Sequence, residues 1–138
     1  MKVLVDTPIW SYAFRSKRNG FEQYVSEFET LIADQRVLII GPIRQEILSG
    51  YSESSKFERL NEKLKYFANS PIVDEDYIQA AKFSNICRRN GVQGSHTDFL
   101  ICSVAYRLRA QIFTTDKDFT HYQKHVPVKL LALQGQVE

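Results

Sequence analysis

Short unbroken runs of apolar residues alternate along the chain with longer stretches in which apolar positions recur every three or four residues. An unbroken run is typical of a strand that a parallel sheet buries on both faces, whereas the three-to-four spacing is typical of an amphipathic helix. The predicted strands cover residues 3–5, 37–40, 72–73, 112–115 and 128–133. The predicted helices cover residues 9–14, 21–34, 43–48, 51–69, 74–90 and 98–105. This order predicts an α/β fold with a mainly parallel sheet and right-handed crossovers.

Prolines and glycines mark several of the predicted boundaries. Pro8 and Pro42 stand where helices begin, because the fixed backbone of proline suits the first helical position. Pro71 interrupts the helical pattern before it, and Gly91 follows a helix as a typical C-terminal glycine. The chain contains no internal repeat and no low-complexity segment, so residues 1–138 are predicted to form a single domain.

The composition is that of an ordinary globular domain, with 43% hydrophobic and 25% charged residues. A chain of 138 residues buries enough surface to fold without disulfides or a structural metal. The formal net charge of +2 neither supports nor excludes nucleic-acid binding, because a local patch is sufficient for it. Cys87 and Cys102 have apolar neighbours in helical segments and are predicted to be buried thiols. We expect a cytoplasmic protein, because no apolar run matches a signal peptide or a membrane span.

Four acidic residues share one place in the predicted fold, the carboxyl edge of the sheet, where ligands of parallel sheets gather. Asp6 and Asp116 directly follow predicted strands, and Glu46 lies in a helix that follows another strand. Asp98 stands at the start of the apolar stripe of its helix. Such a stripe faces the protein interior, which is an unusual place for a carboxylate. We therefore expect these four side chains to converge.

Converging carboxylates predict a cation site. Carboxylates that lie together repel one another, so a bound cation makes the cluster favourable. Ligand sets made only of oxygen suit Mg²⁺ or Mn²⁺, which also bind phosphate oxygens. The implied chemistry is metal-assisted attack on a phosphodiester, in which one or two ions activate a water molecule and neutralise charge on the phosphate. The hydroxyls of Thr7 and Thr114 either bond the carboxylates or substrate, or are ordinary strand-end hydroxyls.

Each acid also has a purely structural explanation. Asp6 is a good N-cap before Thr7-Pro8, and Asp98 is spaced to form a capping box with Ser95. Glu46 is placed to stabilise a helix N-terminus, and Asp116 is placed to cap the turn after its strand. We favour the shared site, because four unrelated caps would have no reason to occupy compatible positions at the strand ends.

Other sequence patterns are weaker. His121 and His125 are spaced i,i+4 like half of a zinc site, but no further ligand lies near them, so exposure to solvent is the favoured interpretation. The sequence has no G-x-S-x-G, Walker A or G-x-G-x-x-G motif, and neither cysteine has an identifiable catalytic histidine.

The sequence resembles the PIN domain, and within it the VapC-type toxins of bacterial and archaeal toxin–antitoxin pairs. The resemblance runs essentially end to end. It rests on VLVDT at 3–7, PIRQEIL at 42–48, TDFLI at 97–101 and FTTDKDF at 113–119. The order and spacing of these segments, together with the chain length, make it fairly specific.

The resemblance implies a three-layer α/β/α sandwich with a mainly parallel central sheet and an endoribonuclease that depends on Mg²⁺ or Mn²⁺. The acidic quartet of the family corresponds to Asp6, Glu46, Asp98 and Asp116, with Asp6 and Asp98 the surest metal ligands. Asp118 matches the second acid of the last motif and either supports a metal through water or helps the turn. Pro8 departs from the small polar residue of many relatives, which puts a polar contact in question but not the metal site.

The resemblance also implies partners. It suggests an RNA substrate, a homodimer and a VapB-type antitoxin that lays a peptide across the site. Arg15, Lys17 and Arg18 are candidates for contact with the RNA backbone, or they form a solvated basic turn. The apolar segments 9–14 and 21–32 either face the antitoxin or pack in the core.

Two other classes of function remain open. One is a non-catalytic PIN-like module that binds RNA or a partner without cleavage, against which the complete quartet argues. The other is a phosphoacceptor or phosphatase domain, but such proteins usually carry a second acid beside the first, where Thr7 and Pro8 stand here.

Overall fold

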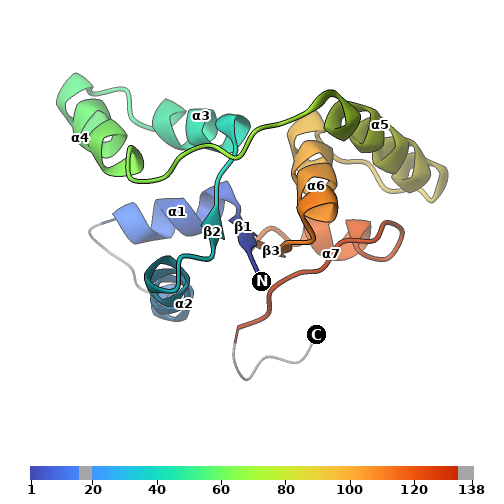
Figure 1. Ribbon diagram of the computed structural model, residues 1–138, viewed down its shortest axis with the longest axis horizontal. Helices are drawn as coiled ribbons and strands as arrows, with labels where there is room; N and C mark the ends of the chain where they lie inside the picture. The colour runs from blue at the N-terminus through green and yellow to red at the C-terminus, as the bar shows by residue number, and fades with distance from the viewer. Residues whose placement is uncertain (16–19, 134–138) are drawn as a thin grey trace.

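A parallel three-stranded sheet lies at the centre of the computed structural model, which describes residues 1–15 and 20–133 (Figure 1). Its strands are β1 (Val3–Val5), β2 (Val37–Leu38) and β3 (Gln111–Phe113), in the order β2-β1-β3. All three residues of β1 are fully buried, which explains the apolar run without alternation. The predicted parallel sheet is confirmed.

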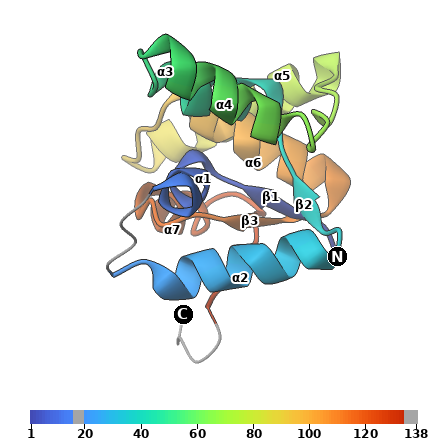
Figure 2. The same ribbon diagram turned by 90° about the vertical axis from the view of Figure 1, so that its left-hand side faces the viewer.

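Helices cover both faces of the sheet and complete the predicted α/β/α sandwich. They are α1 (Thr7–Phe14), α2 (Glu22–Ala33), α3 (Gly41–Ser49), α4 (Ser54–Leu64), α5 (Asp74–Arg89), α6 (His96–Leu108) and α7 (Asp118–Tyr122). Figure 2 shows α2 on one side of the sheet and α6 on the other. None of the described helices is long and apolar enough to cross a membrane.

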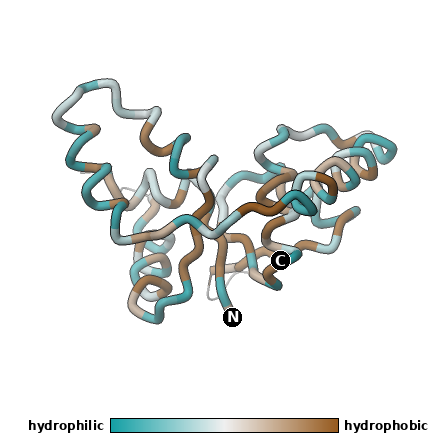
Figure 3. Tube along the Cα trace, turned by 45° about the horizontal axis from the view of Figure 1, so that its top comes forward, coloured by the Kyte–Doolittle hydropathy of each residue, from teal (hydrophilic) through white to brown (hydrophobic). Residues whose placement is uncertain are grey.

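The hydrophobic core surrounds β1. Trp10 is fully buried, its indole N–H donates to the carbonyl oxygen of Val5 at 2.9 Å, and its ring meets those of Phe28 and Phe67 edge to face. Figure 3 shows the hydrophobic strands at the centre and the largely hydrophilic outer helix α4. Both cysteines are buried thiols, as predicted.

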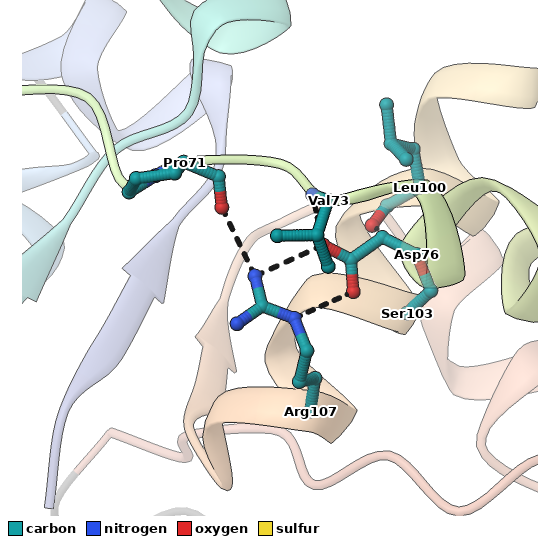
Figure 4. Close-up of polar contacts among 6 residues, drawn as sticks. All are labelled: Pro71, Val73, Asp76, Leu100, Ser103 and Arg107. Atoms are coloured by element: carbon teal, nitrogen blue, oxygen red, sulfur yellow. Dashed lines mark hydrogen bonds and ion pairs between the residues drawn. The ribbon is translucent and has the colours of Figure 1, made fainter.

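Helices α5 and α6 are joined by a partly buried ion pair (Figure 4). The Asp76 carboxylate, 2% exposed, accepts two hydrogen bonds from the Arg107 guanidinium at 2.8 and 2.9 Å. The same guanidinium donates to the carbonyl oxygen of Pro71 at 3.0 Å, and the Val73 N–H donates to Asp76. Burial alone would raise the pKa of Asp76, but these hydrogen bonds and the arginine charge hold it below its usual value.

Two predicted strands are wrong. Residues 72–73 do not form a strand, because the Val73 N–H is bonded to Asp76 at the start of α5. The chain instead makes one parallel bridge earlier, between Asn69 and Ile39. Residues 128–133 likewise make a single bridge, between Leu130 and Ile112, and are otherwise irregular.

Several boundaries also differ from the predicted ones. The predicted strand 112–115 ends at Phe113, so Thr114 and Thr115 lie in the loop that leads to Asp116. The predicted strand 37–40 is regular only at its first two residues. The predicted helix 51–69 is shorter at both ends, and α7 was not predicted at all.

Candidate metal centre

Asp6 lies where β1 ends and α1 begins. Its N–H donates to the carbonyl oxygen of Phe113 on β3 at 2.9 Å, which fixes its backbone against the sheet. Its carboxylate Oδ1 accepts the N–H of Thr7 at 2.8 Å, and Oδ2 accepts the hydroxyl of Thr114 at 2.8 Å. Asp6 is therefore the N-cap of α1, and its 6%-exposed carboxylate is held rigidly at the carboxyl edge of the sheet.

Asp98 lies in the first turn of α6. Its N–H donates to the side-chain oxygen of the N-cap, Ser95, at 3.0 Å. Its carboxylate Oδ2 accepts a hydrogen bond from the Tyr122 hydroxyl at 2.6 Å. The backbone part of the predicted capping box is thus present, while the carboxylate is also held from α7.

Asp116 and Asp118 lie together between β3 and α7. The Asp116 N–H donates to the Thr114 hydroxyl oxygen at 3.0 Å, and Asp116 Oδ1 accepts the N–H of Asp118 at 2.9 Å. Carboxylate oxygens of Asp98, Asp116 and Asp118 all lie within 4.8 Å of one another, close enough to hold one ion. Thr114 therefore connects Asp6 to the loop that presents the other acids.

The pKa values show that the acids repel one another. Burial raises the pKa of Asp6 to about 6, against the hydrogen bonds from Thr114 and Thr7, and the charges of Asp98 and Glu46 raise it further. Burial also raises the pKa of Asp98, and Asp116 and Asp118 add to that rise, against hydrogen bonds from Tyr122 and Ser95. A cation among these carboxylates would favour their charged forms.

Glu46 completes the set of predicted acids. It lies on α3 with its side chain at the surface, and partial burial together with the charge of Asp98 raises its pKa. A cleft of about 370 Å³ opens beside it and is lined by residues that flank the other acids, including Thr7 and Thr97. Charge interactions thus link Asp6 and Glu46 to each other and to Asp98, and Asp98 to Asp116, at one edge of the sheet.

One unsatisfied hydroxyl belongs to the residue that follows Asp6 and lines the same cleft as Glu46. Among the described residues, Thr7 Oγ1 is the buried side-chain polar atom without a hydrogen-bond partner. An unpartnered buried hydroxyl is unfavourable unless a water molecule, ion or substrate group pairs with it. Together with the oxygen-only donor set, this orphaned atom fits a hydrated divalent cation.

The remaining predicted residues have mixed outcomes. Arg15 is exposed at the C-terminus of α1, with its guanidinium 5.5 Å from the centre of the Tyr12 ring. Lys17 and Arg18 lie outside the described residues. His121 is exposed as predicted, whereas His125 is half-buried, and neither joins the acidic cluster among the described residues.

Sequence reasoning missed Tyr122, whose hydroxyl contacts Asp98. No pattern in the sequence marks it, because α7 has only five residues and the two partners are 24 positions apart. The apolar residues of the predicted antitoxin surface are mostly explained by the core, since Ile9, Val25 and Phe28 are buried.

Comparison with known families decides the identity of the fold. The profile of the PIN domain matches residues 3–125, nearly the whole chain. The chain belongs to the PIN domain family. PIN domains are generally nucleases, and the edge at which this PIN domain gathers its acids is the natural ligand edge of a parallel sheet. No curated protein matches the sequence.

Solved structures share the fold of this PIN domain. FitAcB from Neisseria gonorrhoeae is 20% identical, with a TM-score of 0.78 over 94% of this chain and 96% of that one. VapBC2 from Rickettsia felis, bound to a DNA fragment from their promoter, is 16% identical, with a TM-score of 0.77 over 95% and 98%. VapBC-1 from nontypeable Haemophilus influenzae is 16% identical, with a TM-score of 0.74 over 95% and 97%. At these identities the likeness concerns the fold.

Proposed function

We propose that this PIN domain is an endoribonuclease that depends on Mg²⁺ or Mn²⁺. The observation that carries the proposal is the convergence of mutually repelling carboxylates around the buried Asp6 and the half-buried Asp98, beside the orphaned hydroxyl of Thr7. Such a cluster is unfavourable in the free protein and favourable around a cation. The nuclease character of PIN domains supports the same function.

The residues that would hold the cation are Asp98, Asp116 and Asp118, whose carboxylate oxygens lie within 4.8 Å of one another, together with Asp6 and Glu46, each of which interacts electrostatically with Asp98. A bound divalent cation supplies activation of water and neutralisation of charge on the phosphate. Asp6 brings a carboxylate whose orientation is already fixed by two hydrogen bonds. Thr114 orders the loop of Asp116 at the same time.

A basic cleft supports binding of RNA. Helix α1 begins beside the acids and ends at a cleft of about 580 Å³ whose charged lining residues are all basic. This lining comprises Arg15, Lys56, Arg59 and Lys63, together with Phe14, Tyr51 and Leu60. Cations that follow a backbone and rings that stack on bases are the usual elements of a single-strand binding surface. We therefore place Arg15 in the proposed RNA path.

The decisive assay incubates the purified protein with labelled single-stranded RNAs, with Mn²⁺ or with EDTA. We expect endonucleolytic cleavage with Mn²⁺, no cleavage with EDTA, and loss of at least about 100-fold in rate for Asp98→Asn, since the metal clamp provides most of the catalysis. Asp34→Asn, an exposed acid at the end of α2, is the matched control. A folded wild-type protein inert toward varied RNAs with Mn²⁺ would favour a non-catalytic binding module.

The biological role that we infer is that of the toxin in a toxin–antitoxin pair, as a homodimer with a VapB-type antitoxin. The shared fold with FitAcB and VapBC structures supports this role. Induced expression of the wild-type chain in bacteria is expected to arrest growth, and Asp6→Asn is expected to relieve the arrest. Equal toxicity of both proteins at equal expression levels would contradict the role.

A further inference from the structure

A tyrosine from α7 reaches the acidic cluster. Tyr122 is fully buried, and its hydroxyl donates to Asp98 Oδ2 at 2.6 Å, a short charge-assisted hydrogen bond. A carboxylate has two oxygens and about four lone pairs, so one donor leaves it able to bind a cation.

Packing fixes where this hydroxyl can lie. The Tyr122 ring meets the Phe119 ring edge to face at 5.2 Å and the Phe99 ring at 4.9 Å. Phe119 is its neighbour on α7, and Phe99 follows Asp98 on α6. The ring is therefore locked between the two helices, and its hydroxyl has a single direction, toward the acid.

Gly94 closes the other side of the hydroxyl. A Cβ added at Gly94 would lie 2.3 Å from the Tyr122 oxygen and 2.7 Å from Cζ, distances that no packed protein tolerates. The glycine is needed for space and not for its backbone angles, because it is not among the residues with positive φ. The loop before α6 thus approaches so closely that only hydrogen fits at this position.

We propose that Tyr122 is a positioning residue that orients the Asp98 carboxylate toward the divalent cation, and that Gly94 is required because it leaves room for the Tyr122 hydroxyl. The inference rests on the proposed metal-dependent function and adds to it two residues that do not touch the ion. Groups that orient a metal-binding side chain typically change metal affinity by 10- to 100-fold when removed.

Calorimetric titration of Mn²⁺ into metal-free protein at neutral pH tests this directly. Tyr122→Phe keeps the ring and removes only the hydroxyl. We expect its Mn²⁺ binding to weaken by at least about tenfold while its near-ultraviolet circular dichroism stays native. The matched control is Tyr106→Phe, which removes the hydroxyl of a tyrosine that is 48% exposed near the C-terminal end of α6. That variant is expected to bind Mn²⁺ like the wild type.

A second pair of variants tests the glycine. Gly94→Ala is expected to weaken Mn²⁺ binding as Tyr122→Phe does, because the new Cβ displaces the hydroxyl. Gly50→Ala is its control, since a Cβ there would make an ordinary contact of 3.5 Å with the Ile47 carbonyl oxygen.

Each outcome separates this inference from the proposed function. Wild-type binding with unchanged binding by Tyr122→Phe would overturn the positioning role and leave the metal site standing. Equal weakening by Tyr106→Phe would overturn it too, because general loosening would then explain both variants. Native binding by Gly94→Ala would overturn the role of the glycine. Absence of Mn²⁺ binding by the wild type would overturn the metal site and this inference with it.

Discussion

At the end of β1, the Asp6 carboxylate accepts hydrogen bonds from Thr7 and Thr114 while the charges of Asp98 and Glu46 act against its ionisation. The cap and the proposed metal ligand are therefore compatible roles of one residue. The cap fixes the carboxylate, and the fixed carboxylate adds to the repulsion that a cation would relieve.

The raised pKa of Asp6 predicts how stability depends on pH. Its folded-state pKa of about 6 exceeds the usual value of 3.8, so the folded protein binds more protons between these values. The stabilisation from this proton is fully present below pH 3.8 and is lost as the pH rises through about 6. The free energy of unfolding falls by up to about 3 kcal/mol as a result. In metal-free protein, Asp6→Asn is expected to gain stability relative to the wild type as the pH rises through this range.

Urea unfolding of the two metal-free proteins across this pH range measures the difference. Asp34→Asn, which changes an exposed acid, is the control and should follow the wild type at each pH. A difference between Asp6→Asn and the wild type that stays constant with pH would contradict the raised pKa.

At the scale of elements, the link between α5 and α6 holds the helix that carries Asp98. Arg107→Ala would leave the buried Asp76 carboxylate without its arginine, an uncompensated buried charge. Because Arg107 itself is 34% exposed, we expect a loss of about 2 kcal/mol, below that of a fully buried pair. Denaturant unfolding measures it, with Arg89→Ala on α5 as the control; equal losses in both variants would contradict the role of the pair.

The elements differ in how far local pattern determines them. The strand predicted from the buried run at Val3–Val5 is correct, because β2 and β3 pair with it on both sides. The apolar runs at 72–73 and 128–133 do not form regular strands. The N–H groups of Val73 and Val128 bond local acceptors, and the second run pairs with β3 only at a single bridge. Helix α7 is too short for any helical period to mark it.

The candidate site shows the same division. Asp6, Glu46, Asp98 and Asp116 are recognisable from their places after strands and on helices, and the structure brings them together. The hydrogen bonds that hold these acids in place cannot be recognised from the sequence. Thr114 to Asp6 spans 108 positions, and Tyr122 to Asp98 depends on how α7 packs against α6.

At the scale of the whole molecule, the proposed homodimer needs an apolar contact. Tyr77 and Ile78 on α5 are our candidates for it because they are 56% and 58% exposed. We expect light scattering to give twice the mass of one chain for the wild type. For the double variant Tyr77→Glu, Ile78→Glu we expect the mass of a single chain. Tyr66→Glu changes another exposed tyrosine and should stay dimeric. A monomeric wild type, or a dimeric double variant, would contradict this interface.

The central claim concerns where a divalent cation binds, and anomalous diffraction from crystals grown with Mn²⁺ tests it most directly. We expect a manganese peak bounded by the carboxylates of Asp6, Asp98 and Asp116, and no such peak in Asp98→Asn crystals grown alike. A manganese peak elsewhere on the molecule, or an empty carboxylate cluster at a Mn²⁺ concentration that supports RNA cleavage, would contradict the account.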